Sequence, residues 1–153
     1  MKKHLVIAIL ILISAGAGWI GYQYSYPTTL VAIHKVGKVD HMSIVLISNP
    51  PLTDAGKITW WQKNEAFLKN KYNIPSPNAE GRFYISIWDF AEGYKEVEKY
   101  DRLCFDDMKK KENCIDKNWV MTIEDNRKGR LQYKIGEGSY IEEANGKLIK
   151  QKD

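Results

Sequence analysis

The chain begins with one long apolar segment, and the sequence after it mixes apolar and charged residues. Residues 5–22 contain no charged side chain. At about 1.5 Å per residue, a helix of this length spans roughly 27 Å, close to the ~30 Å hydrocarbon core of a bilayer. The pattern predicts one membrane-spanning helix, because no later segment is apolar enough to cross again.

The first strands predicted after this segment form a hairpin. From Leu30 to Ile47, apolar and polar residues alternate, with Gly37 and Lys38 between two valines. Glycine at the first of two turn residues is typical of a type II′ hairpin turn. The resulting register would place His34 opposite His41, with both histidines on the exposed face.

One helix and further strands are predicted for the rest of the chain. Thr53 or Asp54 can cap a helix that runs to about Tyr72, with an apolar stripe at helical spacing. Residues 82–90 are β-branched and aromatic on both faces, which is typical of a central strand. Residues 91–118 show no clear period and predict a long ordered connection with one or two helical turns. Four short strands follow, at 119–124, 131–135, 139–143 and 147–149.

These elements predict an α+β fold. An N-terminal transmembrane helix precedes a small, mostly antiparallel sheet of about six strands with one long helix packed on it. The predicted divisions are a cytoplasmic flank at 1–4, an anchor at 5–26 and an exported domain at 27–153, which is long enough for one modest core.

The charged flank of the apolar segment indicates its orientation. Lys2 and Lys3 precede the segment, and the positive-inside rule keeps such a flank in the cytoplasm. The anchor would then lie in the inner membrane, with the C-terminal domain in the periplasm of a Gram-negative cell. Aromatic residues gather where the segment would leave the membrane, as expected at headgroup level: Trp19, Tyr22, Tyr24 and Tyr26. The alternative is a signal peptide cleaved after residues 15–17, which would export the same domain.

The charge of the chain indicates which partners to expect, and its cysteines indicate whether a disulfide forms. The net charge is +4, and the lysine run at 109–111 is not interleaved with aromatics, so nucleic acid is not an expected partner. Cys104 and Cys114 are the two cysteines, and their spacing differs from the Cys-x-x-Cys of redox sites. In an exported domain, such a pair is expected to form a structural disulfide.

Motifs for catalysis are not evident in the sequence. Neither His34 nor His41 has a nucleophile motif nearby, and no glycine-rich phosphate loop is present. A histidine pair across a hairpin is only a weak candidate for a metal site, because zinc usually needs three or four protein ligands. Four acids surround the cysteines without the spacing of a calcium loop: Asp101, Asp106, Asp107 and Asp116. We therefore expect no enzymatic activity, no cofactor and no metal.

A surface that binds another protein is the remaining expectation. Recognition concentrates on loops carried by a rigid scaffold, and aromatic and arginine side chains are the usual hot spots. The predicted surface lies around the long connection and uses Trp88, Tyr94, Tyr100 and Arg102, with Asp106 and Asp107 as its polar rim. The alternative is that these aromatics cover the edge of the sheet.

Several aromatic and acidic stretches are distinctive: 56–61, 71–75, 88–94, 100–108 and 113–115. Together they resemble a family of small enterobacterial membrane proteins of unknown function, over nearly the whole chain. The resemblance implies an N-terminal anchor and a compact domain with paired cysteines, and it brings no catalytic residues.

The expected function is therefore that of a membrane-anchored periplasmic module that binds another protein. Its most concrete form is an immunity-type protein that neutralises a toxin active in the cell envelope. The alternative is a structural or stress-related envelope component that binds an inner-membrane complex or the cell wall.

Overall fold

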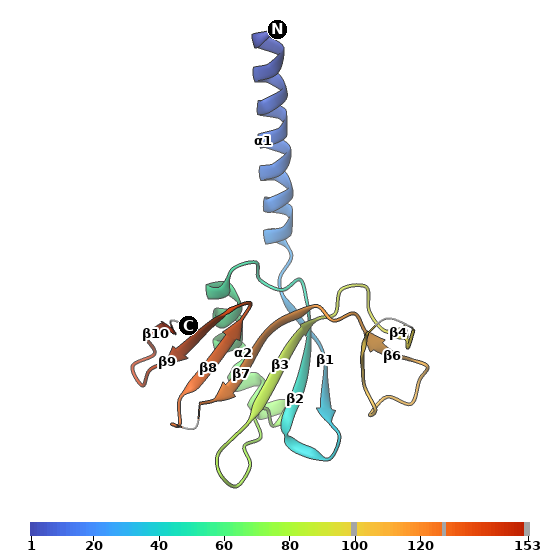
Figure 1. The fold of residues 1–153 in the computed structure, drawn as a ribbon, viewed down its shortest axis with the longest axis vertical. Helices are drawn as coiled ribbons and strands as arrows, with labels where there is room; N and C mark the ends of the chain where they lie inside the picture. The colour runs from blue at the N-terminus through green and yellow to red at the C-terminus, as the bar shows by residue number, and fades with distance from the viewer. Residues whose placement is uncertain (99–100, 127, 152–153) are drawn as a thin grey trace.

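A computed structural model describes residues 1–98, 101–126 and 128–151. Its first element, α1 (Lys2–Ser25), is a single helix that stands clear of the rest of the chain (Figure 1). Its stretch Lys3–Tyr22 is long and apolar enough to cross a membrane, and no other helix of the described residues passes that test. The predicted apolar helix is confirmed.

The domain is built on a sheet of seven strands in the order β1-β2-β3-β7-β8-β9-β10. Among the strands of the described residues, only β2 and β3 pair in parallel, because α2 connects them as a crossover. The α+β class is confirmed, with seven strands in place of about six. Their bounds are Thr29–Val36, Val39–Ser48, Tyr84–Asp89, Trp119–Asp125, Leu131–Ile135, Gly138–Glu142 and Leu148–Gln151.

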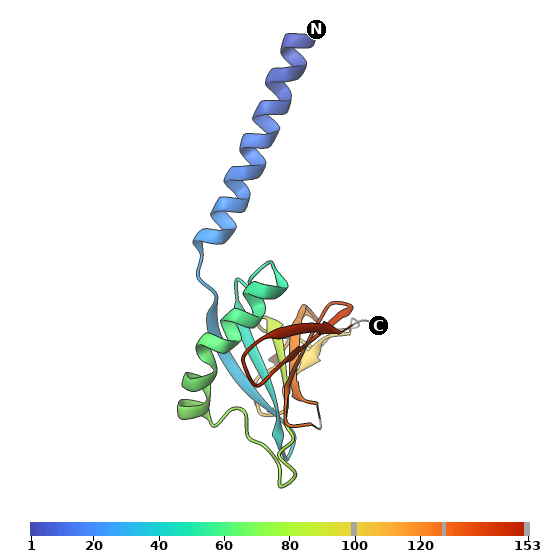
Figure 2. The ribbon, with the colours of Figure 1, turned by 90° about the vertical axis from the view of Figure 1, so that its left-hand side faces the viewer.

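Helix α2 (Asp54–Tyr72) covers one face of this sheet (Figure 2). Thr53 caps it, with the hydroxyl accepting from the Gly56 backbone N–H at 3.0 Å. Asn73 ends it in the left-handed conformation, at φ 54°. The main core lies between α2 and the sheet, and its fully buried side chains include Ile58, Trp61, Leu68, Val45, Ile85 and Ile123.

The register of the first hairpin differs from the prediction. Val36 pairs with Val39 as expected, and Gly37 has the φ of +58° that its turn needs. A bulge then places His34 opposite Ile44, so the predicted His34–His41 pairing is wrong. Extra residues in β2 change which side chains share a face, and His34 becomes buried at 5 % exposure.

A second, smaller sheet lies on the face opposite α2. Its strands are β4 (Lys95–Glu96), β5 (Leu103–Cys104) and β6 (Glu112–Ile115), in the order β4-β6-β5. The described part of the connection therefore contains short strands where helical turns were predicted. We call residues 90–117 the disulfide module. A second core lies between it and the large sheet, with Leu46, Phe105 and Ile115 buried at its centre.

Candidate functional site

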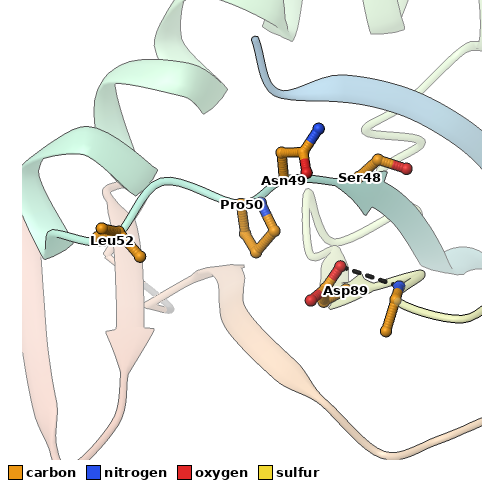
Figure 3. Close-up of a pocket in the computed structure, with 6 residues that line it drawn as sticks. Ser48, Asn49, Pro50, Leu52 and Asp89 are labelled. Carbon is orange, nitrogen blue, oxygen red and sulfur yellow. Dashed lines mark hydrogen bonds between the residues drawn. The ribbon is translucent and has the colours of Figure 1, made fainter. Parts of the chain in front are cut away.

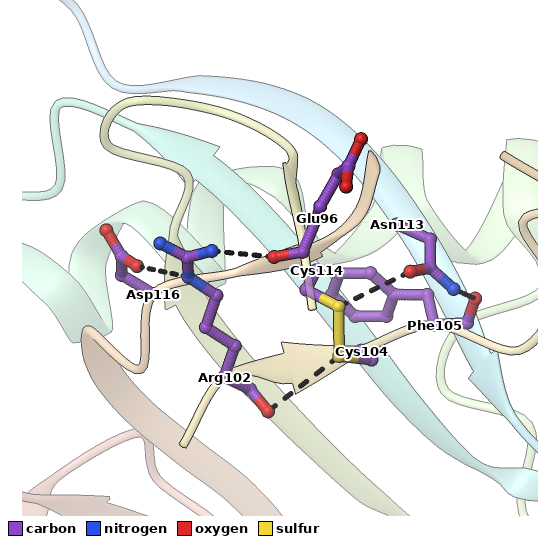
Figure 4. The surroundings of a disulfide bond; sticks show 7 residues. All are labelled: Glu96, Arg102, Cys104, Phe105, Asn113, Cys114 and Asp116. Atoms are coloured by element: carbon purple, nitrogen blue, oxygen red, sulfur yellow. Dashed lines mark hydrogen bonds and ion pairs between the residues drawn. A yellow bond between two sulfur atoms is a disulfide. The ribbon is translucent and has the colours of Figure 1, made fainter. Parts of the chain in front are cut away.

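The disulfide module is closed by the bond between Cys104 and Cys114. The two residues face each other across β5 and β6, with Cα atoms 3.9 Å apart and sulfurs 2.10 Å apart. The predicted disulfide is thus present (Figure 4). Cys114 is fully buried and Cys104 is exposed, so the bond links the core side of the module to its surface.

Arg102 lies beside the disulfide and joins three parts of the module (Figure 4). Its guanidinium donates from Nε to Asp116 Oδ1 at 3.1 Å and from Nη1 to the carbonyl oxygen of Glu96 at 2.6 Å. Its Nη2 lies 3.3 Å from Glu98 Oε2. Since only 10 % of the Arg102 side chain is exposed, these contacts hold it inside the module.

Asp116 is the centre of this charged network. Besides Arg102, it accepts a 2.6 Å hydrogen bond from Lys95 Nζ. The hydrogen bonds from Lys95 and then from Arg102 hold the pKa of Asp116 below its usual value. A lowered carboxyl pKa stabilises the folded state at neutral pH, and that contribution is lost as the pH falls through the lowered pKa.

His34 joins strand β1 to the disulfide module. Its Nδ1 lies 2.9 Å from Asp107 Oδ1, and its Nε2 lies 2.8 Å from the Tyr94 hydroxyl. Its ring also stacks on Phe105, with centroids 3.9 Å apart. A neutral imidazole satisfies both polar contacts when Nδ1–H donates to Asp107 and Nε2 accepts from Tyr94. Sequence reasoning missed this contact, because the partners lie 60 and 73 residues away.

The row Asp107–His34–Tyr94 has the carboxylate–imidazole–hydroxyl order of a nucleophilic triad. Burial and then the nearby Asp107 charge raise the pKa of the Tyr94 phenol. The protonated phenol can donate its hydrogen bond to His34 Nε2. The arrangement is suited to fastening the module to the sheet.

The predicted binding residues occupy positions that brace the module. Trp88 packs in the second core, Tyr94 bonds to His34, and Arg102 lies in the charged network. Asp107 is held by His34 and is not a free rim residue, whereas Asp106 is exposed. Tyr100 lies outside the described residues. This placement supports the alternative in which the aromatics cover the sheet.

The candidate metal site at His34 and His41 depends on how these two histidines lie. Since His34 faces Ile44, it cannot share a hairpin metal site with His41. Among the residues with described positions, no three His, Cys, Asp or Glu side chains gather as metal ligands.

The outer surface of the module carries an exposed apolar side chain. Val97 is 70 % exposed, and the exposed Glu96 and Glu98 lie on either side of it in the sequence.

Open cavities surround the segment that connects β2 to α2. The cavity in Figure 3 measures about 430 Å³ and is lined by Ser48, Asn49, Pro50, Leu52, Asp89 and Ala91. Asp89 Oδ1 accepts from the Ala91 backbone N–H at 3.0 Å and fixes the turn after β3. Adjacent cavities of about 220 and 300 Å³ extend along the same segment.

Comparison with known proteins identifies a family for the chain. No curated protein and no solved structure is recognisably similar to the chain. One family does match, over residues 1–152, and its description is "Enterobacterial putative membrane protein (DUF943)". This agrees with the apolar helix α1, and the expected resemblance is confirmed. The chain belongs to this enterobacterial membrane protein family of unknown function.

Proposed function

We propose that the chain is a single-pass protein of the inner membrane whose domain lies in the periplasm and binds another protein. Lys2 and Lys3 support a cytoplasmic N-terminus, and the aromatic side chains of Trp19, Tyr22 and Tyr26 are exposed near the other end of α1. The bond between Cys104 and Cys114 supports an oxidising compartment.

The observation that carries the binding proposal is the internal bracing of the disulfide module. A disulfide, the Asp116 network and the His34 contacts hold the described part of this surface region in place. A loop held rigid before it meets its partner loses less conformational entropy on binding. Bracing of this kind supports a binding surface, and it assigns Tyr94 and Arg102 to positioning that surface.

Val97 is the contact residue that this surface offers. A large apolar side chain at 70 % exposure contributes little to the core and gains free energy when a partner covers it. Exposed acids flank it at Glu96 and Glu98, and lysines follow at 109–111 on the same module. A partner that covers Val97 would therefore also lie against the acids on either side of it.

The form of this function that we favour is an immunity-type protein that neutralises a toxin active in the envelope. The small anchored domain and its preorganised surface support it, since such an inhibitor needs to sit where the toxin acts and to bind tightly. The neighbouring gene offers a simple check: a toxin gene supports immunity, whereas an envelope operon supports a structural or stress-related component.

We expect a photo-crosslinking amino acid at Val97 to capture a protein in living cells. The matched control is the same amino acid at Phe67, which is 47 % exposed on α2. Capture at position 97 and not at 67 is the expected result. The Val97→Asp variant should keep its melting temperature and lose most of the complex, because a buried charge without a partner is unfavourable. Equal capture at both positions, or undiminished complex with Val97→Asp, would show that the module is not the binding surface.

A further inference from the structure

A short linker joins the anchor to one end of the domain. Three residues, 26–28, join the end of α1 to the start of β1. The Thr28 hydroxyl donates to the carbonyl of Asn49 at 2.5 Å and so fixes the linker to the domain. The two residues that remain reach about 7 Å when extended. The domain end that carries Asn49 therefore lies close to the level at which α1 leaves the bilayer.

Side chains at this end of the domain are suited to a membrane surface. Leu52 is 62 % exposed and follows two prolines, and Trp119 is 37 % exposed at the start of β7. Tyr26, at the end of α1, lines a cavity together with Leu52. Aromatic side chains prefer the headgroup level of a bilayer, so the anchor and the domain place such groups next to one another.

A groove of about 300 Å³ lies within this end of the domain. Lys57 of α2 and Asp89 of β3 both line it, as do Leu52 and Trp119. Lys57 and Asp89 are half-buried, yet neither forms an ion pair with any residue of the described ranges. Two opposite charges thus line one groove without neutralising each other.

We propose that this groove binds the headgroup of a zwitterionic phospholipid from the leaflet into which the domain end faces. The Lys57 ammonium would pair with the lipid phosphate, and the Asp89 carboxylate with the headgroup ammonium. Asp89 keeps one oxygen for this contact, because Oδ1 accepts from Ala91. Leu52 and Trp119 would lie against the glycerol and the upper acyl chains. A headgroup without an ammonium would leave Asp89 beside a phosphate, which is unfavourable.

The lipid site depends on insertion of α1 in a bilayer and is independent of the partner that the disulfide module binds. It gives the domain a fixed orientation on the membrane, with two attachments in place of one. The described part of the disulfide module, on the face of the sheet opposite α2, contributes no residue to the groove.

Quenching of Trp119 fluorescence tests the site in the full-length chain. The chain is placed in phosphatidylcholine vesicles that contain phosphatidylcholine with a nitroxide on its headgroup ammonium. The Trp119 contribution is the difference between the chain and its Trp119→Phe variant. We expect strong quenching, reduced by about half or more in the Lys57→Gln/Asp89→Asn variant, because both headgroup contacts are then weakened. The asparagine amide oxygen can still accept from the Ala91 backbone N–H, so the turn after β3 is kept.

The matched control is Lys110→Gln/Asp106→Asn, which removes the same two charges from exposed positions on the disulfide module. Its Trp119 quenching should equal that of the unmodified chain. Two results would overturn the proposal: Trp119 that is not quenched in the unmodified chain, or Lys57→Gln/Asp89→Asn quenching that equals the control. Neither result would bear on protein capture at Val97, so the two proposals fail separately.

Discussion

Replacing Cys104 with serine should lower the free energy of unfolding by about 2.8 kcal/mol, the loop entropy that closing 11 residues removes from the unfolded chain. That is a large share of the roughly 5–15 kcal/mol that typically stabilises a domain. Cys104 is exposed, so serine there introduces no buried polar group. Denaturant unfolding of the domain, monitored by tryptophan fluorescence, measures the loss.

Chemical reduction supplies a matched control for this variant. The reduced unmodified chain should unfold at the same denaturant concentration as Cys104→Ser, and reductant should leave the variant unchanged. If Cys104→Ser is as stable as the oxidised chain, the disulfide neither stabilises the domain nor braces the module.

Replacing His34 with alanine should cost about 3 kcal/mol, because it removes a buried ring and leaves the Tyr94 hydroxyl without its partner. His34 is 5 % exposed and touches the module through Asp107, Tyr94 and Phe105. The loss should therefore be accompanied by faster amide exchange in the described parts of the disulfide module, while α2 keeps its protection.

His41→Ala is the control for this prediction. His41 lies on β2, the strand paired with β1, and is half-buried. Its side chain forms no hydrogen bond or ion pair with the described residues. Its loss should change stability by less than about 0.5 kcal/mol. Equal effects of the two alanine variants would mean that the Asp107–His34–Tyr94 row does not fasten the module.

Helix ends and turns were predicted well, because each is determined by residues a few positions apart in the sequence. Thr53 and Asn73 bound α2, since a capping hydroxyl and a left-handed C-cap act on neighbouring backbone groups. Gly37 marked the hairpin turn for the same reason. The later strands also lie near their predicted positions, because each carries several alternating residues before its turn.

Features that depend on distant contacts escaped prediction. Strands β4 and β5 contain two residues each, which is too short for any period to be visible. The bulge in the first hairpin also has no local signature. It places His34 against Phe105, a residue 71 positions later in the chain.

The side chains of the candidate binding site were also predicted only in part. Aromatic and arginine side chains pointed to Trp88, Tyr94 and Arg102. Trp88 and Tyr94 do pack in the second core, and Arg102 lies in the charged network around Asp116. Composition alone could not show that they point inward, toward the second core and Asp116. Exposure identifies Val97 instead, and exposure is a property of the folded chain.

The proposed function requires that the domain lies outside the cytoplasm while α1 stays in the membrane. A phosphatase that folds only in the periplasm, fused after Asp153, tests it directly. We predict an active fusion in the membrane fraction, with a chain that begins at Met1 or Lys2. An inactive phosphatase would contradict export of the domain, and a soluble chain that begins at Gly18 would contradict the retained anchor.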